Sequence, residues 1–190
     1  MNNYLKLLLF GLFLIPICTS AQTKQKAFCG FIEGGYSVKL GGTFGISWEE
    51  INTIHGYQAT PNLFVGAGIG FHFMPKFEKE IIDWRPYWKR DSKMEIPLFA
   101  DFQWNITNKK ISPFVDLRLG HNVSNGSGLY GSFGFGGKYK FKEKQAVYAL
   151  LTYSTHKLTF EEAIVNSPSH DYRDIEETIS AASLKIGFEF

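Results

Sequence analysis

The chain has 190 residues and a mass of 21.6 kDa, and 44% of its residues are hydrophobic and 16% aromatic. This aromatic content excludes global disorder, because disordered chains are poor in aromatic residues and rich in charge. A net charge of +2 without a basic stripe disfavours a nucleic-acid binder, and two cysteines cannot supply a disulfide-rich scaffold or a four-ligand zinc site.

The N-terminus carries the features of a secretory signal. A short, weakly basic start at residues 1–6 precedes an apolar run at residues 7–15, which is too short to span a bilayer as a helix. The small residues of 19–21 then fit a cleavage site. We therefore predict a signal peptide over residues 1–21 and a mature domain over residues 22–190. The alternative is a lipoprotein signal acylated at Cys18, which Ile17 disfavours because a small residue is preferred there.

The mature chain shows period-two alternation of apolar and polar residues, which is typical of β-strands with two unlike faces. No later stretch reaches 18 consecutive apolar residues, so we expect no transmembrane helix. The pattern is clearest in residues 94–106. The alternation predicts eight strands, at residues 27–38, 43–57, 63–74, 94–106, 112–123, 129–141, 145–158 and 179–190.

The connections between these strands alternate in length. Those after the second, fourth and sixth strands are short, whereas the connections at 75–93 and 159–178 are long and charged. An up-and-down barrel with short periplasmic turns and longer outer loops has this parity. The alternation slips near Glu49 and Glu50, and we expect a β-bulge there.

The polar face of these strands is rich in glycine and charge, which favours a membrane barrel over a soluble, lipocalin-like one. Glycines would leave room for larger neighbours in a narrow lumen. Because buried charges need partners, we predict a polar network inside the barrel and no open pore. The predicted acidic members are Glu33, Glu95, Asp101 and Asp116, and the predicted basic members are Arg118, Lys138 and Lys185.

The last segment has an apolar residue at every second position, namely Ala182, Leu184, Ile186, Phe188 and Phe190. This pattern resembles the C-terminal β-signal that the outer-membrane insertion machinery of bacteria recognises. From about residue 27 to 190 the chain resembles the small eight-stranded outer-membrane protein β-barrel family of the OmpA-like transmembrane-domain type. The resemblance implies an all-β, eight-stranded antiparallel up-and-down transmembrane β-barrel. It also implies a multi-pass protein of a Gram-negative outer membrane, with lipid and lipopolysaccharide as its surroundings.

The sequence contains no pattern that favours catalysis. Some lipid A-modifying enzymes of the outer membrane use a serine and a histidine with a carboxylate. Ser154 and His156 share a strand face here, but the parity of the strand points both into the lumen. The five histidines lack metal-ligand spacing, and the glycine-rich stretch at 66–70 opens no helix that would bind a nucleotide. We therefore predict no enzyme activity, no cofactor and no metal.

The two long connections carry the candidate contact residues. Residues 75–93 contain six basic and four acidic residues, whereas residues 159–178 contain one basic and six acidic residues. Opposite charge should hold these segments together over the barrel mouth. Trp84, Tyr87 and Trp88 are candidates for binding a sugar or a protein partner. The alternative places them in the aromatic girdle at the membrane interface.

These observations predict a structural or surface-interaction role for an outer-membrane barrel, with an extracellular ligand or partner that the sequence does not identify. The first alternative is a porin-like transporter of small solutes or apolar compounds, which a lumen filled by side chains disfavours. The remaining alternatives are a lipid A-modifying enzyme and a soluble, lipocalin-like binder.

Overall fold

The computed structural model describes residues 28–41, 43–124, 128–142, 145–165 and 171–190. The predicted signal peptide, residues 1–21, lies outside the described residues. Within these ranges no helix has the length and apolar character needed to cross a membrane. The described chain is all-β. Its strands are β1 (Phe28–Lys39), β2 (Trp48–Gln58), β3 (Leu63–Met74), β4 (Phe77–Ile82), β5 (Arg85–Arg90), β6 (Lys93–Glu95), β7 (Pro97–Asn105), β8 (Ile111–Asn122), β9 (Leu129–Lys142), β10 (Gln145–Ala163) and β11 (Tyr172–Glu189).

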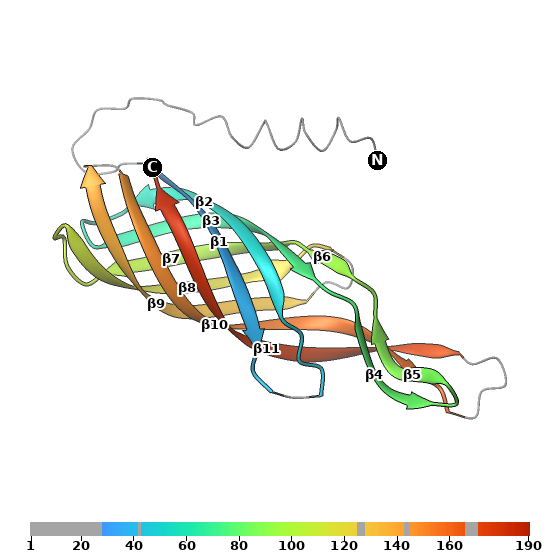
Figure 1. Ribbon diagram of the computed structural model, residues 1–190. Coiled ribbons are helices and arrows are strands. Elements are labelled where there is room, and N and C mark those ends of the chain that lie inside the picture. The colour runs from blue at the N-terminus through green and yellow to red at the C-terminus, as the bar shows by residue number, and fades with distance from the viewer. Residues whose placement is uncertain (1–27, 42, 125–127, 143–144, 166–170) are drawn as a thin grey trace, which may run out of the picture.

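Eight of these strands form a closed antiparallel barrel, as the alternation predicts (Figure 1). Going round the wall, the order is β1, β2, β3, β7, β8, β9, β10 and β11, and β11 closes the barrel by pairing with β1. The short strand β6 pairs with β3 just before β7 does, so the two together make one wall position. Closure leaves no free edge within the wall, which is a requirement for a sheet that lies in lipid.

The two faces of the wall differ in chemistry. On β7 the outward residues Leu98, Phe102 and Trp104 are between 38% and 52% exposed, whereas the inward residues Asp101 and Gln103 are fully buried. Outward apolar residues likewise recur on the other wall strands. A soluble barrel has the reverse arrangement, so this wall is built to face lipid.

The predicted bulge in the second strand is wrong. β2 pairs with β1 and β3 in an unbroken register through Glu49 and Glu50. The sequence pattern appeared to slip there because Glu50 is a charged residue at an inward position, beside inward Trp48 and Asn52. The register irregularity lies elsewhere, between Gln145 and Ala146 at the start of β10.

The predicted long loops are largely strands. Most of the segment at 75–93 forms the hairpin β4–β5, and β10 and β11 remain paired as far as Ala163 and Tyr172. These segments extend beyond the wall as two neighbouring hairpins (Figure 1). Their charged residues obscured the strand pattern, because a sheet outside the membrane has no need of an apolar outer face.

The barrel therefore has two distinct ends. At the short-turn end, β2 connects to β3 through residues 59–62 and β7 to β8 through residues 106–110. At the projecting end, the hairpins β4–β5 and β10–β11 extend past the wall (Figure 1). The predicted parity of short and long connections is confirmed, with strands in place of loops.

Candidate functional sites: the lumen and the projecting sheet

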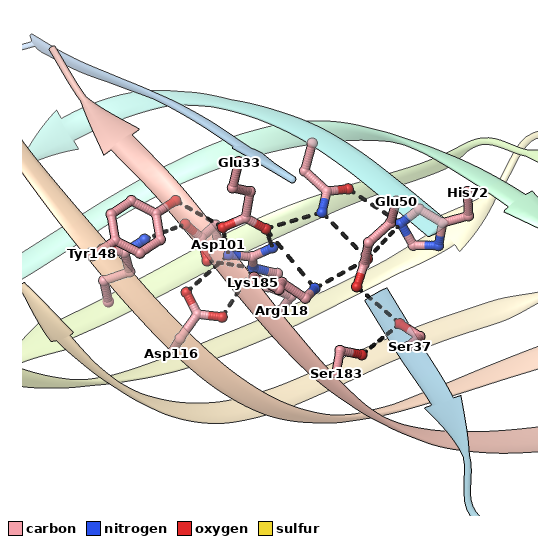
Figure 2. A network of polar contacts seen from close by, with 12 residues as sticks. Glu33, Ser37, Glu50, His72, Asp101, Asp116, Arg118, Tyr148, Ser183 and Lys185 are labelled. Atoms are coloured by element: carbon pink, nitrogen blue, oxygen red, sulfur yellow. Dashed lines mark hydrogen bonds and ion pairs between the residues drawn. The ribbon is translucent and has the colours of Figure 1, made fainter. Parts of the chain in front are cut away.

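The centre of the lumen is closed by an ion pair between opposite walls (Figure 2). Arg118 on β8 donates two hydrogen bonds to Glu33 on β1, with Nη1 to Oε1 at 2.5 Å and Nη2 to Oε2 at 3.1 Å. Both side chains are fully buried. Such a two-pronged bond fixes both groups, because the planar guanidinium matches the carboxylate geometry.

Arg118 also forms ion pairs with two further buried carboxylates. Its Nε atom lies 2.9 Å from Asp116 Oδ1 and 3.4 Å from Asp101 Oδ1. Tyr148 adds a hydroxyl that donates to Glu33 at 2.7 Å. One guanidinium is therefore shared by three buried carboxylates at the centre of the lumen. Removing this guanidinium would leave all three carboxylates buried and poorly paired.

A second part of the network extends toward the projecting end. Lys185 on β11 donates to Glu50 at 3.1 Å, and its Nζ lies 3.9 Å from Glu33, which joins the two parts (Figure 2). His72 Nε2 lies 3.1 Å from Glu50 Oε2. The hydroxyl of Ser37 donates to Glu50 at 3.0 Å. All of these residues come from different inward positions of the wall, so the network braces it from inside.

Apolar side chains fill the lumen on both sides of the network. One buried cluster contains Phe31, Ile54, Phe64, Phe99, Phe114, Tyr130, Tyr148 and Leu150, and the other contains Ile46, Trp48, Met74, Leu158, Phe160, Ile179 and Ala181. Glycines make the room for them: a Cβ at Gly68 would lie 2.5 Å from the ring of Phe99. The predicted role of the inward glycines is confirmed at this position.

The predicted polar network is present, with some partners changed. Lys138 pairs with Glu189 at 2.6 Å, at the short-turn end. Glu95 pairs with Arg90 of β5, so it belongs to the projecting end. Sequence reasoning missed Glu50, because the apparent slip of alternation hid its inward direction. It also missed Arg90, which lay in a predicted loop.

Ser154 and His156 point into the lumen, as their parity predicts, and are at most 3% exposed. His156 packs against Trp48 with ring centroids 4.9 Å apart. Neither residue reaches the outer face, where acyl chains would lie. No group of three or more metal-ligating side chains is found in the part of the chain that the structure describes.

The two projecting hairpins are joined into one sheet. β5 pairs with β10 through Lys89 with Glu161 and Trp88 with Glu162, so the strand order is β4, β5, β10, β11. The Lys89 Nζ lies 3.1 Å from Glu161 Oε2. The hydroxyl of Tyr172 donates to the carbonyl of Pro86 at 3.0 Å. The two segments thus lie together as expected, but as paired strands that extend past the wall and not as loops over the barrel mouth. That opposite charge holds them together stays a prediction.

The three candidate contact residues have different surroundings. Trp84 is 100% exposed at the tip of β4–β5, where Asp83 and Trp84 both adopt positive φ, of 50° and 63°. Bulky residues rarely adopt this conformation. Trp88 instead donates its indole N–H to Glu162 at 3.1 Å, and Tyr87 packs on Trp88 with centroids 4.6 Å apart. Trp88 is therefore part of the sheet, and Trp84 is the one left facing solvent.

Glu162 is the anchor of this junction. Its carboxylate accepts hydrogen bonds from Arg173, with Nε at 2.7 Å, and from Trp88. These two donors hold the pKa of Glu162 below its ordinary value of 4.5. The carboxylate is therefore charged throughout the neutral range.

The residues of the predicted β-signal lie on the last strand of the wall. Leu184 and Ile186 face outward and are 60% and 68% exposed, and Phe190 is 36% exposed. Phe188 belongs to the same outward face and stacks on Phe190, with centroids 6.2 Å apart. Their recognition by the insertion machinery stays a prediction.

A closed eight-stranded antiparallel barrel with an apolar exterior and a filled polar lumen defines the class of small outer-membrane β-barrels. The chain has this fold. It is similar to the crystal structure of Neisserial surface protein A, at 11% identity and a TM-score of 0.57, over 87% of this chain and 98% of that one.

Two other solved structures are more distant. The N-terminal β-barrel domain of Pseudomonas aeruginosa OprF matches at 15% identity and a TM-score of 0.48, over 88% of this chain and 100% of that one. The Escherichia coli outer membrane protein W matches at 14% identity and a TM-score of 0.43, over 89% of this chain and 100% of that one. No family model and no curated protein sequence matches the chain. The likeness to Neisserial surface protein A supports the fold alone.

Proposed function

We propose that this protein is an integral outer-membrane β-barrel that acts at the cell surface through its projecting sheet, in a structural or interaction role. The observation that carries the proposal is the joining of two hairpins into one sheet beyond a barrel whose lumen is filled. Turns in outer-membrane barrels are short on the periplasmic side and longer outside. The projecting sheet is therefore the extracellular part, surrounded at its base by lipopolysaccharide.

The filled lumen argues against the transporter alternative. The ion pair of Arg118 with Glu33 crosses the lumen, and apolar clusters lie on both sides of it. Ions passing through would have to displace buried, paired charges, which costs several kcal/mol. The buried positions of Ser154 and His156 argue against a lipid A-modifying enzyme. We therefore propose a non-enzymatic protein that conducts neither ions nor solutes.

The proposal is tested in cells that express the full chain. The protein should fractionate with the outer membrane and show a fast-migrating band on SDS gels that boiling removes. Trypsin added to intact cells should cut within the projecting sheet and leave the barrel whole. A protein that stays soluble in the periplasm, or one that intact cells protect fully from trypsin, would contradict the proposal.

A further inference from the structure

The outer half of β11 has an unpaired edge. Within the wall, β11 pairs with β10 on one side and with β1 on the other, but the pairing with β1 ends at Lys39 and Ala181. One last backbone bond follows, from Leu40 N–H to the Ser180 carbonyl at 3.0 Å. Beyond it, residues 172–179 pair with β10 alone among the described strands (Figure 1).

The register identifies the backbone groups on this edge. In an antiparallel strand, one residue directs both its N–H and its C=O to the same neighbour, and successive residues alternate. Phe190 directs both groups to Gly30 of β1, and Ser180 directs its carbonyl to Leu40. Even-numbered residues of β11 therefore face the β1 side. Along the outer half, the edge donors and acceptors belong to Tyr172, Asp174, Glu176 and Thr178.

A recess lies beside this edge. Residues Glu177 to Ser180 form one side of it, and the β1–β2 connection forms the other through Leu40, Gly41, Thr43, Phe44 and Gly45. Its volume is about 310 Å³. The recess therefore has a strand edge on one side and, on the other, the apolar residues Leu40 and Phe44 among small and polar ones. This combination suits a strand whose side chains alternate between apolar and polar.

The opposite edge of the projecting sheet is less suited to pairing. On β4, Glu80 has a φ of 55°, which interrupts the extended backbone and leaves Glu80 out of the pairing with β5. Such an irregularity protects an edge strand from added strands. On β11 the register with β10 is continuous from Tyr172 to Glu189.

We propose that the free edge of β11 is a strand-addition site for an extended segment of a protein partner with basic residues on one face and apolar residues on the other. Residues 172–179 hold three acidic residues and one basic residue, so basic side chains opposite them are favoured. Apolar side chains on the other face would enter the recess beside Phe44. A second copy of this chain is disfavoured, because its own β11 would place acidic residues against acidic ones.

This inference deepens the proposed function, since it assigns the surface through which the projecting sheet contacts a partner. The probe is a fluorescently labelled peptide of alternating lysine and valine, capped at both ends and about six residues long, the usual length of a strand. A glutamate–valine peptide is its control. Binding is measured by fluorescence anisotropy to the full chain folded in nonionic detergent, and only the lysine–valine peptide should bind.

A proline substitution separates strand addition from simple charge attraction. The N–H of Thr178 faces the free edge, so Thr178→Pro removes an edge donor and leaves the ladder with β10 and the charge unchanged. This substitution should weaken binding of the lysine–valine peptide about fivefold or more, whereas the Thr178→Val variant should bind the peptide like the wild type. If Thr178→Pro loses its heat-modifiable band, Asp174→Pro, farther from the wall, replaces it with Asp174→Asn as its matched control.

Two results would overturn the site: no binding of the lysine–valine peptide to the wild type, or equal binding to the proline variant and its control. The heat-modifiable band reports the barrel independently of this edge. If the wild-type chain keeps that band and fractionates with the outer membrane but does not bind the lysine–valine peptide, the strand-addition site is rejected and the proposed function is left standing.

Discussion

Arg118 and Glu33 face each other across the widest separation that an eight-stranded wall allows. Three wall strands lie between β1 and β8 in either direction around the barrel, so the two strands are opposite each other. The two buried hydrogen bonds between them, at 2.5 Å and 3.1 Å, therefore join opposite walls through the centre of the lumen. The lumen is therefore a packed core, like the core of a soluble domain. It differs in that buried ion pairs replace some of the apolar contacts.

Removing Arg118 should destabilise the barrel strongly. In Arg118→Leu, Glu33, Asp101 and Asp116 all lose their shared cation while still buried, so the free energy of unfolding should fall by about 3–5 kcal/mol. Urea unfolding in lipid vesicles, followed by tryptophan fluorescence and by gel mobility, measures it. The control is Arg173→Leu, which removes an exposed guanidinium and should cost about 1 kcal/mol or less. Equal stability of the two variants would contradict the role of Arg118.

Gly187 should tolerate no side chain. A Cβ there would overlap the ring of Tyr148, whose hydroxyl bonds Glu33. Gly187→Ala should therefore lower the free energy of unfolding by about 1–3 kcal/mol. Gly137 is the matched control, because a Cβ at this outward position meets nothing within 4 Å. If Gly137→Ala proves as destabilising as Gly187→Ala, close packing in the lumen is not the reason for the inward glycines.

Neutralising the two acidic residues of β10 that contact β5 should loosen the β4–β5 hairpin. Glu161→Gln combined with Glu162→Gln removes the ion pair with Lys89 and weakens the bond from Trp88. Trypsin should then cleave faster after Lys89, while the barrel band remains. Glu177→Gln is the control, since this residue lines the recess beside β11 rather than the junction with β5. Unchanged cleavage in the double variant would show that charge does not hold the hairpins together.

The same junction should depend on pH in one direction. Because the pKa of Glu162 is lower in the folded protein, its contribution is complete above its ordinary value of 4.5 and is lost as the pH falls through the lower, folded value. Trp88, labelled with 5-fluorotryptophan and observed by ¹⁹F NMR, should keep one environment from pH 7 to pH 5 and change only in more acidic solution. Glu162→Gln should abolish that change, and a transition near neutral pH would contradict the assignment.

The wall of the barrel was predictable because lipid and a narrow lumen impose opposite demands on successive residues. Phe133 and Phe135 face outward and Ser132 and Gly134 inward, so the period of two is visible in the sequence itself. The inward charges could be listed in the same way. Their pairing could not, because Arg118 and Glu33 are 85 residues apart and meet only once the barrel closes.

For the projecting sheet, the sequence predicted the charges of its segments but not their strands. Outside the membrane the strands β4, β5 and the ends of β10 and β11 have no lipid-facing side, so their sequences alternate weakly and resemble loops. The turn at Asp83 and Trp84 also gave only a weak signal, because aspartate is common at such positive φ values but tryptophan is not. The free edge of β11 depends on where β1 stops pairing, which no local pattern contains.

Ion conduction tests the closed lumen most directly. The purified chain, with its heat-modifiable band intact, is inserted into a planar lipid bilayer between salt solutions, and the current is recorded under an applied voltage. We expect no steady current above that of the bare bilayer, because the Arg118–Glu33 link and the two apolar clusters block the lumen. A stable, ohmic single-channel current that scales with the number of inserted barrels would contradict it.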